Sequence, residues 1–221
     1  LKGCFVGAFT ATMLQSSSLT MIVLIGLINA GILTLKQGIG VMLGSEIGTT
    51  VTAQLIAFKI GVFFLPLIAV GFFLSSLAKS GKSKNIGQMI KSFGLIYLGM
   101  DLMTSSIQPL QNEPGLSDFL FSFGQFPLYG LIAGIVVTAM FQSSAALVAL
   151  VISLGINNLI TLPAAIAMVL GANIGTCVGE LFAVIGSSLS SKRLALAQLT
   201  INAFGILLFF PFIANFSGFL E

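Results

Sequence analysis

The chain has 221 residues, of which 57% are hydrophobic and only 7% are charged, and its formal net charge is +3. About 25% of the residues of a soluble domain are charged, so the composition excludes a soluble fold and indicates an integral membrane protein without a nucleic-acid partner. The two cysteines lie in apolar segments and histidine is absent, which argues against a disulfide framework, a metal cluster and the commonest general base.

Apolar segments of this chain reach the ~20 residues that cross ~30 Å of hydrocarbon, and none alternates like an outer-membrane barrel, so helical spans are predicted. The first apolar segment, residues 3–29, has the polar run Gln15 to Ser18 at its middle. One interpretation is a continuous helix with a polar seam for packing. The other is a re-entrant hairpin whose two arms, each about 13 residues and ~20 Å long, meet at the polar run.

Three spans are expected next, at about residues 35–58, 61–78 and 92–110. The first of them carries glycines and a run of hydroxyl side chains between Gly44 and Thr52, which suggests a locally unwound helix at membrane depth. A basic loop, residues 79–91, separates the other two. Residues 111–127 then form a loop with a short amphipathic, aromatic segment.

The rest of the chain begins with a second hairpin candidate, residues 128–154, which contains Gln142-Ser143-Ser144. Further spans are expected at about residues 162–185 and 194–216, with a polar, basic loop at 187–193 between them. The first of these spans contains Gly171 to Thr176, a second glycine-rich motif.

The two halves of the sequence repeat each other at one constant shift. Gln15-Ser16-Ser17 corresponds to Gln142-Ser143-Ser144, and Gly44 to Thr49 corresponds to Gly171 to Thr176, both at 127 residues (142 − 15 and 171 − 44). Two polar motifs in one register indicate an internal duplication. We expect a first transport repeat over residues 1–110 and a second over residues 128–221.

The distribution of charge distinguishes the two interpretations of the Gln-Ser-Ser segments. If both are re-entrant hairpins, one face holds Lys2, Lys36 and the basic loops 79–91 and 187–193. The other face then holds Glu113, Asp118 and Glu221, with Lys59 as its one base. If both are full spans, loops 79–91 and 187–193 fall on opposite faces. The positive-inside bias favours the hairpins, with these two loops in the cytoplasm and loop 111–127 and the C-terminus outside. Three crossings then separate the copies, so the repeats are inverted.

The paired motifs resemble those of the sodium/phosphate cotransporter family, type II, including its bacterial members. The resemblance covers almost the whole chain and includes two further stretches, Lys84 to Gly99 and Asn202 to Gly205. With the charge distribution, it implies an all-α integral membrane protein of two inverted-topology repeats, each a re-entrant helical hairpin followed by a broken transmembrane helix. It also implies an earlier membrane helix ahead of Leu1, the counterpart of residues 92–110.

Three positions depart from the family pattern. Glu46 stands where the family, and the chain's own Asn173, has asparagine. Ala145 replaces a third serine, and Gln198 occupies a position where members often have histidine. An ionisable residue within a span is functional by default, so Glu46 is expected to be a Na+ ligand or a protonatable group. Glu180 either pairs with the unwound backbone or faces water.

The expected site contains no fixed positive charge, because a lysine at the bilayer midplane would hold phosphate too tightly for release. The N-terminal ends of the broken helices offer free N–H groups and serine hydroxyls instead. The predicted phosphate ligands are Ser16, Ser17, Ser143 and Ser144. Carbonyls freed by unwinding are expected to help bind sodium, together with the side-chain oxygens of Gln15, Ser18, Ser45, Glu46, Thr49, Thr50, Gln142, Asn173 and Thr176.

The resemblance implies a secondary active symporter of the cell membrane that uses the Na+ gradient to import inorganic phosphate by alternating access. No catalytic residue and no cofactor besides the coupling ion is expected. Bound Na+ offsets the charge of the anion, which is the physical reason for coupling. The alternatives are another oxyanion, proton coupling through Glu46, and a passive anion channel. Expected partners are phosphate, Na+, membrane lipid and a further copy of the chain.

Overall fold

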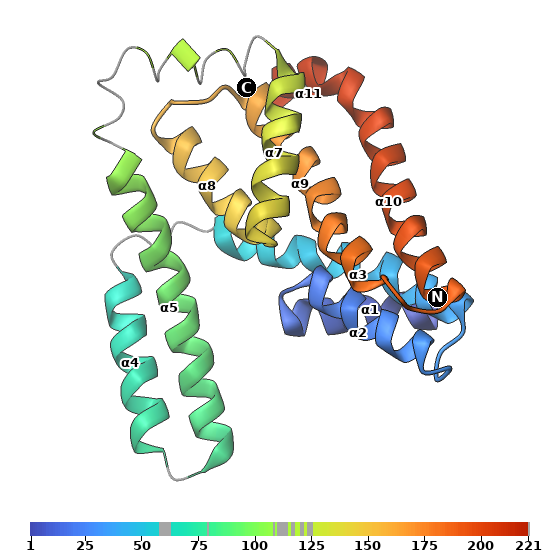
Figure 1. Cartoon of the computed structure of the whole chain (residues 1–221). Helices are drawn as coiled ribbons and strands as arrows, with labels where there is room; N and C mark the ends of the chain where they lie inside the picture. The colour runs from blue at the N-terminus through green and yellow to red at the C-terminus, as the bar shows by residue number, and fades with distance from the viewer. Residues whose placement is uncertain are drawn as a thin grey trace.

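The structure is a computed structural model that describes residues 1–57, 63–78, 80–107 and 126–220, together with positions 109, 115, 118, 119 and 122. Within these residues all regular structure is helical, as predicted (Figure 1). Several residues used in the topology prediction lie outside the described ranges, namely Lys59, Lys79, Glu113 and Glu221. The placement of loop 111–127 and of the C-terminus relative to a membrane therefore stays a prediction.

The helices of the first half are α1 (Lys2–Leu14), α2 (Ser17–Asn29), α3 (Leu35–Ala57), α4 (Phe64–Leu77) and α5 (Gly81–Ile107). Those of the second half are α7 (Pro127–Phe141), α8 (Ser144–Ile156), α9 (Leu162–Ala183), α10 (Leu189–Phe209), the 3-10 helix η3 (Phe210–Phe212) and α11 (Ile213–Leu220). In the described part of the chain, two stretches are long and apolar enough to cross a membrane, α9 and Leu189–Phe219. A 3-10 turn interrupts the second stretch at Pro211, which has no N–H for the preceding turn.

Each Gln-Ser-Ser segment separates two helices instead of lying inside one. The helix before it ends at a glutamine in the left-handed conformation, Gln15 at φ 51° and Gln142 at φ 54°. The next residue, Ser16 or Ser143, is extended, and its Oγ accepts a backbone N–H of the following helix at 3.1 or 3.2 Å. The chain reverses direction at both points (Figure 1). A continuous helix through either segment is therefore excluded, and each segment forms the turn of a helical hairpin.

The predicted unwinding around Gly44 and Gly171 is wrong, because α3 and α9 run through these positions without a break. The glycines allow close packing instead. A Cβ at Gly44 would collide with the backbone carbonyl of Cys4 in α1, and one at Gly171 would collide with that of Leu131 in α7. The two collision partners are again 127 residues apart (131 − 4), so corresponding helix pairs of the two halves pack through corresponding residues.

The hydroxyl side chains in the middle of α3 and α9 bond within their own helices. Thr49 donates to the Ser45 carbonyl at 2.8 Å, and Thr176 donates to the Asn173 carbonyl at 2.9 Å. Bonds of this kind, to a carbonyl three or four residues back, occur in continuous helices and bend them slightly. The expectation that unwinding frees carbonyls for sodium therefore does not hold for these two helices.

The segments predicted as basic loops, 79–91 and 187–193, are largely helical. The helices α5 and α10 begin at Gly81 and Leu189, each after a serine whose Oγ accepts a backbone N–H of the first turn, at 3.2 and 3.3 Å. Lysine and arginine have good helix propensity, so a serine cap is sufficient to start each helix ahead of its apolar part. Most of the basic side chains counted as loop charges therefore lie on helices.

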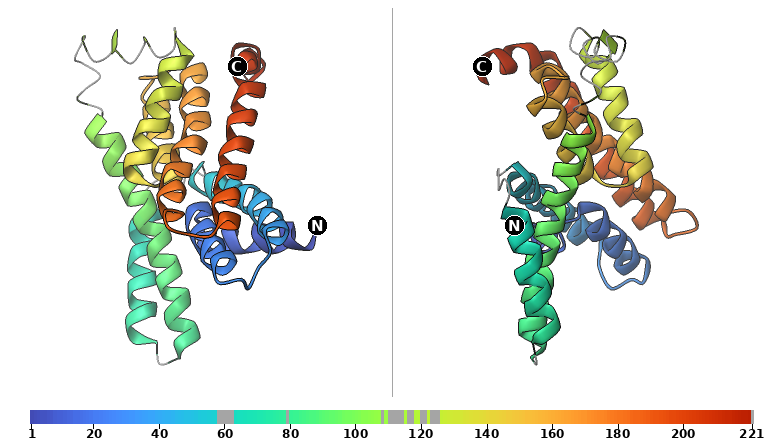
Figure 2. Two further views of the ribbon diagram at one scale, coloured as in Figure 1. Left: turned by 45° about the vertical axis from the view of Figure 1, so that its right-hand side comes forward. Right: turned by 90° about the vertical axis from the view of Figure 1, so that its left-hand side faces the viewer.

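The helix α10 of the second half packs against α2 and α3 of the first half. Ser191 Oγ donates to the Ile25 carbonyl at 3.1 Å, and Ser188 N donates to Asn29 Oδ1 at 2.7 Å. A buried apolar cluster fills the space between these helices and the end of α9: Met21, Leu24, Ile25, Ile28, Met42, Val184, Leu194 and Ala195. The two halves thus share one core, whereas the α4–α5 pair extends away from it (Figure 2).

Candidate functional site

The two Gln-Ser-Ser turns, which are distant in the sequence, line one cavity of about 120 Å³, called here the first cavity. Four consecutive residues of each half contribute to it, Gln15 to Ser18 from the α1–α2 turn and Gln142 to Ala145 from the α7–α8 turn. Thr49 of α3 completes its wall. The motifs that the sequence pairs are therefore adjacent in space.

Two helices, α2 and α8, begin at the first cavity. The first N–H groups of an α-helix have no partner within the helix, and the hydroxyls of Ser16 and Ser143 satisfy one such group in each. Because each hydroxyl accepts that bond, its own hydrogen can be donated to an anion. The remaining first-turn N–H groups and the positive ends of the two helix dipoles favour an anion at the same place.

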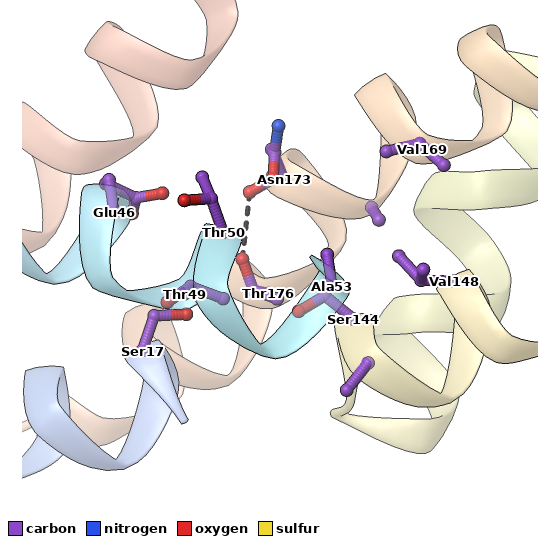
Figure 3. Close-up of a pocket in the computed structure, with 12 residues that line it drawn as sticks. Ser17, Glu46, Thr49, Thr50, Ala53, Ser144, Val148, Val169, Asn173 and Thr176 are labelled. Atoms are coloured by element: carbon purple, nitrogen blue, oxygen red, sulfur yellow. Dashed lines mark hydrogen bonds between the residues drawn. The ribbon is translucent and has the colours of Figure 1, made fainter. Parts of the chain in front are cut away.

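A second cavity, of about 230 Å³, adjoins the first and lies between α3 and α9 (Figure 3). The two cavities share four residues in their walls, the polar Ser17, Thr49 and Ser144 together with Ala145. The other polar side chains that line the second cavity are Glu46 and Thr50 of α3 and Asn173 and Thr176 of α9. Among the described residues that line either cavity, none is basic and Glu46 alone is ionisable.

The threonines of the second cavity present oxygen lone pairs rather than hydrogens. Thr49 and Thr176 donate their hydrogens within their own helices, as described above, and Thr50 donates to the Ile47 carbonyl at 2.7 Å. A hydroxyl whose hydrogen is committed can act only as an acceptor. Such oxygens, together with amide and carboxylate oxygens, are the ligands of hard cations. The second cavity therefore suits a cation, and the first suits an anion.

The structure brings together all but one of the site residues predicted from the sequence. The four predicted phosphate ligands line the first cavity, and every predicted sodium ligand except Ser45 lines one of the two cavities. Ser45 is 0% exposed, donates to the Met42 carbonyl at 2.8 Å and lines neither cavity. The lining of the two cavities thus gives no support to Ser45 as a ligand.

Gln198 of α10 is a residue of this region that sequence reasoning did not assign to the site. Its Nε2 donates to Glu46 Oε1 at 2.6 Å, which connects α10 to α3 across 152 residues of sequence. Glu180 of α9 lies beside this pair and is 1% exposed. Neither of its carboxyl oxygens has a hydrogen-bond partner among the described residues. Both predicted surroundings of Glu180 are wrong, since α9 is not unwound and the side chain does not face water. The sequence feature that could have indicated this buried region is the presence of an acidic residue, Glu180, within an apolar span.

The chain matches the family model described as Na+/Pi-cotransporter in two segments, residues 1–105 and 98–217. It is 30% identical over its whole length to "Uncharacterized protein YqeW" of Bacillus subtilis (strain 168), of which it covers 72%. It is 24% identical over 207 residues, or 94% of the chain, to "Putative inorganic phosphate export protein YjbB" of Escherichia coli (strain K12), of which it covers 38%.

A mammalian relative matches a shorter part of the chain. The "Sodium-dependent phosphate transport protein 2B" of Homo sapiens is 33% identical over 101 residues, which are 43% of this chain and 14% of that protein. The chain therefore spans less than half the length of these two relatives whose names refer to phosphate. No solved structure is significantly similar to it.

The surface and the comparisons point to the same class of protein. Large apolar side chains are exposed on α1, α4 and α10, among them Phe9, Phe72 and Phe209, as expected of surfaces that face lipid. The matching family consists of membrane transporters rather than enzymes, which implies a membrane location. Its model accounts for almost all of the sequence in two segments, and the chain therefore belongs to the Na+/Pi-cotransporter family.

Proposed function

We propose that the chain forms the transport core of a Na+-coupled phosphate transporter, in which the first cavity binds phosphate and the second binds Na+. The proposal depends on one observation above all, that two helix N-termini with serine caps meet at a cavity that no described basic residue lines. The proposed phosphate ligands are Ser16, Ser17, Ser143 and Ser144. The proposed Na+ ligands in the wall of the second cavity are Glu46, Thr49, Thr50, Asn173 and Thr176. Gln15, Ser18 and Gln142 line only the first cavity, where we propose that they bind a Na+ ion beside the phosphate.

Uncharged donors suit a transporter because phosphate must bind and then leave in every cycle. A hydrogen bond to a charged group contributes about 1.5–3 kcal/mol, and a helix end adds about 0.3–1 kcal/mol. Several such contacts together can offset the loss of water around the anion. A lysine or arginine in the same cavity would add a strong attraction at low dielectric and would slow release. The cavity therefore has the donor set of a reversible anion site.

Coupling follows from the adjacency of the two cavities. Ser17, Thr49 and Ser144 belong to both walls, so the two ions would be separated by little more than one side chain. Opposite unit charges on the order of 6 Å apart attract by about 3 kcal/mol at an effective dielectric constant of 20. Each ion should then raise the affinity for the other by roughly 100-fold, and the coupling should be reciprocal.

Alternating access requires two arrangements of the halves around one site, and we propose that the halves are inverted repeats whose hairpins enter the membrane from opposite sides. The contacts of the glycines support the repeat, whereas its inversion rests on the distribution of charge. Gly7 of α1 packs against the backbone of Val41, and Gly134 of α7 packs against that of Met168, again in the 127-residue register (134 − 7 and 168 − 41). Each half would thus move as one hairpin with its packed long helix.

The direction of transport depends on the ion gradients, because a symporter is reversible. We propose import, driven by the inward Na+ gradient of a cell. Export is the second candidate, and the name of the Escherichia coli relative favours it. Proton coupling is the third, because Glu46 is an ionisable group in the wall of the second cavity.

Reconstitution of the protein into liposomes separates these candidates. Uptake of radiolabelled phosphate is measured under an inward Na+ gradient, an equal K+ gradient and a pH gradient, with protein-free liposomes as the control. We expect saturable uptake that requires Na+, reverses when the Na+ gradient is reversed and is not inhibited by sulfate. Equal uptake in Na+ and K+ would reject sodium coupling. Uptake driven by the pH gradient would establish proton coupling, and flux that never saturates would indicate a channel.

A further inference from the structure

Three oxygen atoms in one buried region have no hydrogen-bond partner among the residues that the structure describes. They are both carboxyl oxygens of Glu180 and the Oε1 of Gln198, and each of the two side chains is 1% exposed. A buried polar atom without a partner loses its hydration and gains nothing in return, so native structures contain few of them. Three such oxygens together indicate that something bound there completes their coordination.

Within the described part of the chain, the surroundings of these oxygens contain negative and neutral groups but no compensating positive charge. Glu46 of α3 binds the amide of Gln198, and Glu180 of α9 lies near both. Among the described residues neither carboxylate forms an ion pair, and the basic residues of α10, Lys192 and Arg193, are exposed more than one helical turn before Gln198. Two ionised carboxylates in a water-free environment repel each other, and either a cation between them or a bound proton relieves that repulsion.

The orientation of the Gln198 amide sets the position of its free oxygen. An ionised carboxylate can only accept hydrogen bonds, so Gln198 turns its Nε2 towards Glu46. Among the described residues, the Oε1 on the other arm of the amide has no hydrogen-bond partner and can therefore accept a ligand. Carboxylate and amide oxygens together form the kind of donor set that hard cations prefer.

We propose that Glu180, Gln198 and Glu46 form a site for a monovalent cation, Na+, behind the second cavity. This inference deepens the proposed function and rests on it, because it adds a sodium site built from α9 and α10 to the oxygen ligands that line the second cavity. A single positive charge there would satisfy the free oxygens and offset one of the two carboxylate charges.

The site would also control how the halves pack. Glu46 belongs to the first half, whereas Glu180 and Gln198 belong to the second, so the cation would connect α3 to α9 and α10. Without it, the repulsion between the carboxylates would weaken this contact. Sodium binding would thus favour the arrangement in which the two halves are in close contact around phosphate, before phosphate itself binds.

The test uses Glu180→Gln, which keeps the size of the side chain and removes its charge, with Asp101→Asn as the matched control at an exposed position of α5. Radiolabelled Na+ binding to the purified protein and the Na+ dependence of phosphate uptake are both measured. We expect Glu180→Gln to bind fewer Na+ ions and to raise the half-saturating Na+ concentration by about tenfold or more, because charge count sets cation affinity. Asp101→Asn should behave like the wild type.

A second variant allows the inference to be tested even if Glu180→Gln does not fold. Gln198→Met removes the amide oxygen and keeps an unbranched side chain, and it should also weaken Na+ binding. The inference fails if a folded Glu180→Gln or Gln198→Met protein binds Na+ with wild-type stoichiometry and affinity, which is also the result expected if the region holds only a proton. The proposed function fails separately, if wild-type uptake does not require Na+.

Discussion

Replacement of Ser143 by alanine distinguishes the phosphate role of this residue from its structural role. The substitution removes the cap bond from Ala146 N, which is 3.2 Å long, and a lost serine cap costs about 1 kcal/mol of stability. If the hydroxyl also donates to phosphate, a further 1.5–3 kcal/mol of binding is lost. That loss corresponds to an increase of about 10- to 150-fold in the phosphate KM. The effect on binding should therefore exceed the effect on folding.

The matched control is Ser188→Ala, because Ser188 caps α10 through a bond from Ser191 N of 3.3 Å and lines neither cavity. Both variants are compared with the wild type for Tm in detergent and for phosphate uptake at saturating Na+. We expect similar small decreases in Tm for the two variants and a raised KM only for Ser143→Ala. Ser16→Ala, the corresponding change in the first half, should raise the KM by a similar factor.

The opposite pattern would refute the assignment. If Ser143→Ala and Ser188→Ala lower Tm equally and leave the phosphate KM at the wild-type value, the serine serves only as a helix cap. A large loss of uptake with an unchanged KM would place the effect on a later step of the cycle and would also contradict a direct contact with phosphate.

Two further predictions concern packing and charge. Gly134→Ala should greatly reduce the yield of monodisperse protein, because the new Cβ collides with the backbone of Met168. A Cβ at Gly155 meets no other atom, so Gly155→Ala should stabilise α8 by about 0.5–1 kcal/mol in thermal unfolding. Equal yields of the two variants would contradict close packing of α7 on α9. Glu46→Lys should allow phosphate binding without Na+, because the fixed lysine charge replaces the Na+ ion at the cavity wall. The variant should also transport phosphate more slowly, since the lysine charge cannot leave the site. Phosphate binding to this variant that still requires Na+ would disprove the assignment of Glu46 to the cation cavity.

The positions of the hairpin turns could be predicted because their signal is local. A run of one glutamine and several serines is unusual inside an apolar segment, and its recurrence at Gln142 in one register with Gln15 marks the two places where the helices could turn. The distribution of charge then favoured hairpins over continuous helices. The αL glutamine and the serine cap that end and start the helices follow from the same few residues. Local polarity and the repeat therefore determined this part of the fold.

The behaviour of the glycine motifs could not be predicted, because the same residues permit two structures. Glycine and threonine weaken a helix, but they also allow a neighbouring helix to approach closely. The choice depends on what lies opposite, and the residues opposite Gly44 and Gly171 belong to other helices. In the same way, the bond between Glu46 and Gln198 joins residues 152 positions apart, which no spacing rule can connect.

The attachment of α10 to α2 changes which parts of the protein can move together. Two hydrogen bonds and a continuous apolar contact hold this late helix to the first hairpin, although it follows the second hairpin in the chain. A fragment ending before residue 127 would leave Met21, Leu24 and Ile28 uncovered. The first half is therefore not an autonomous folding unit, and α10 must be synthesised before the first hairpin acquires its final neighbours.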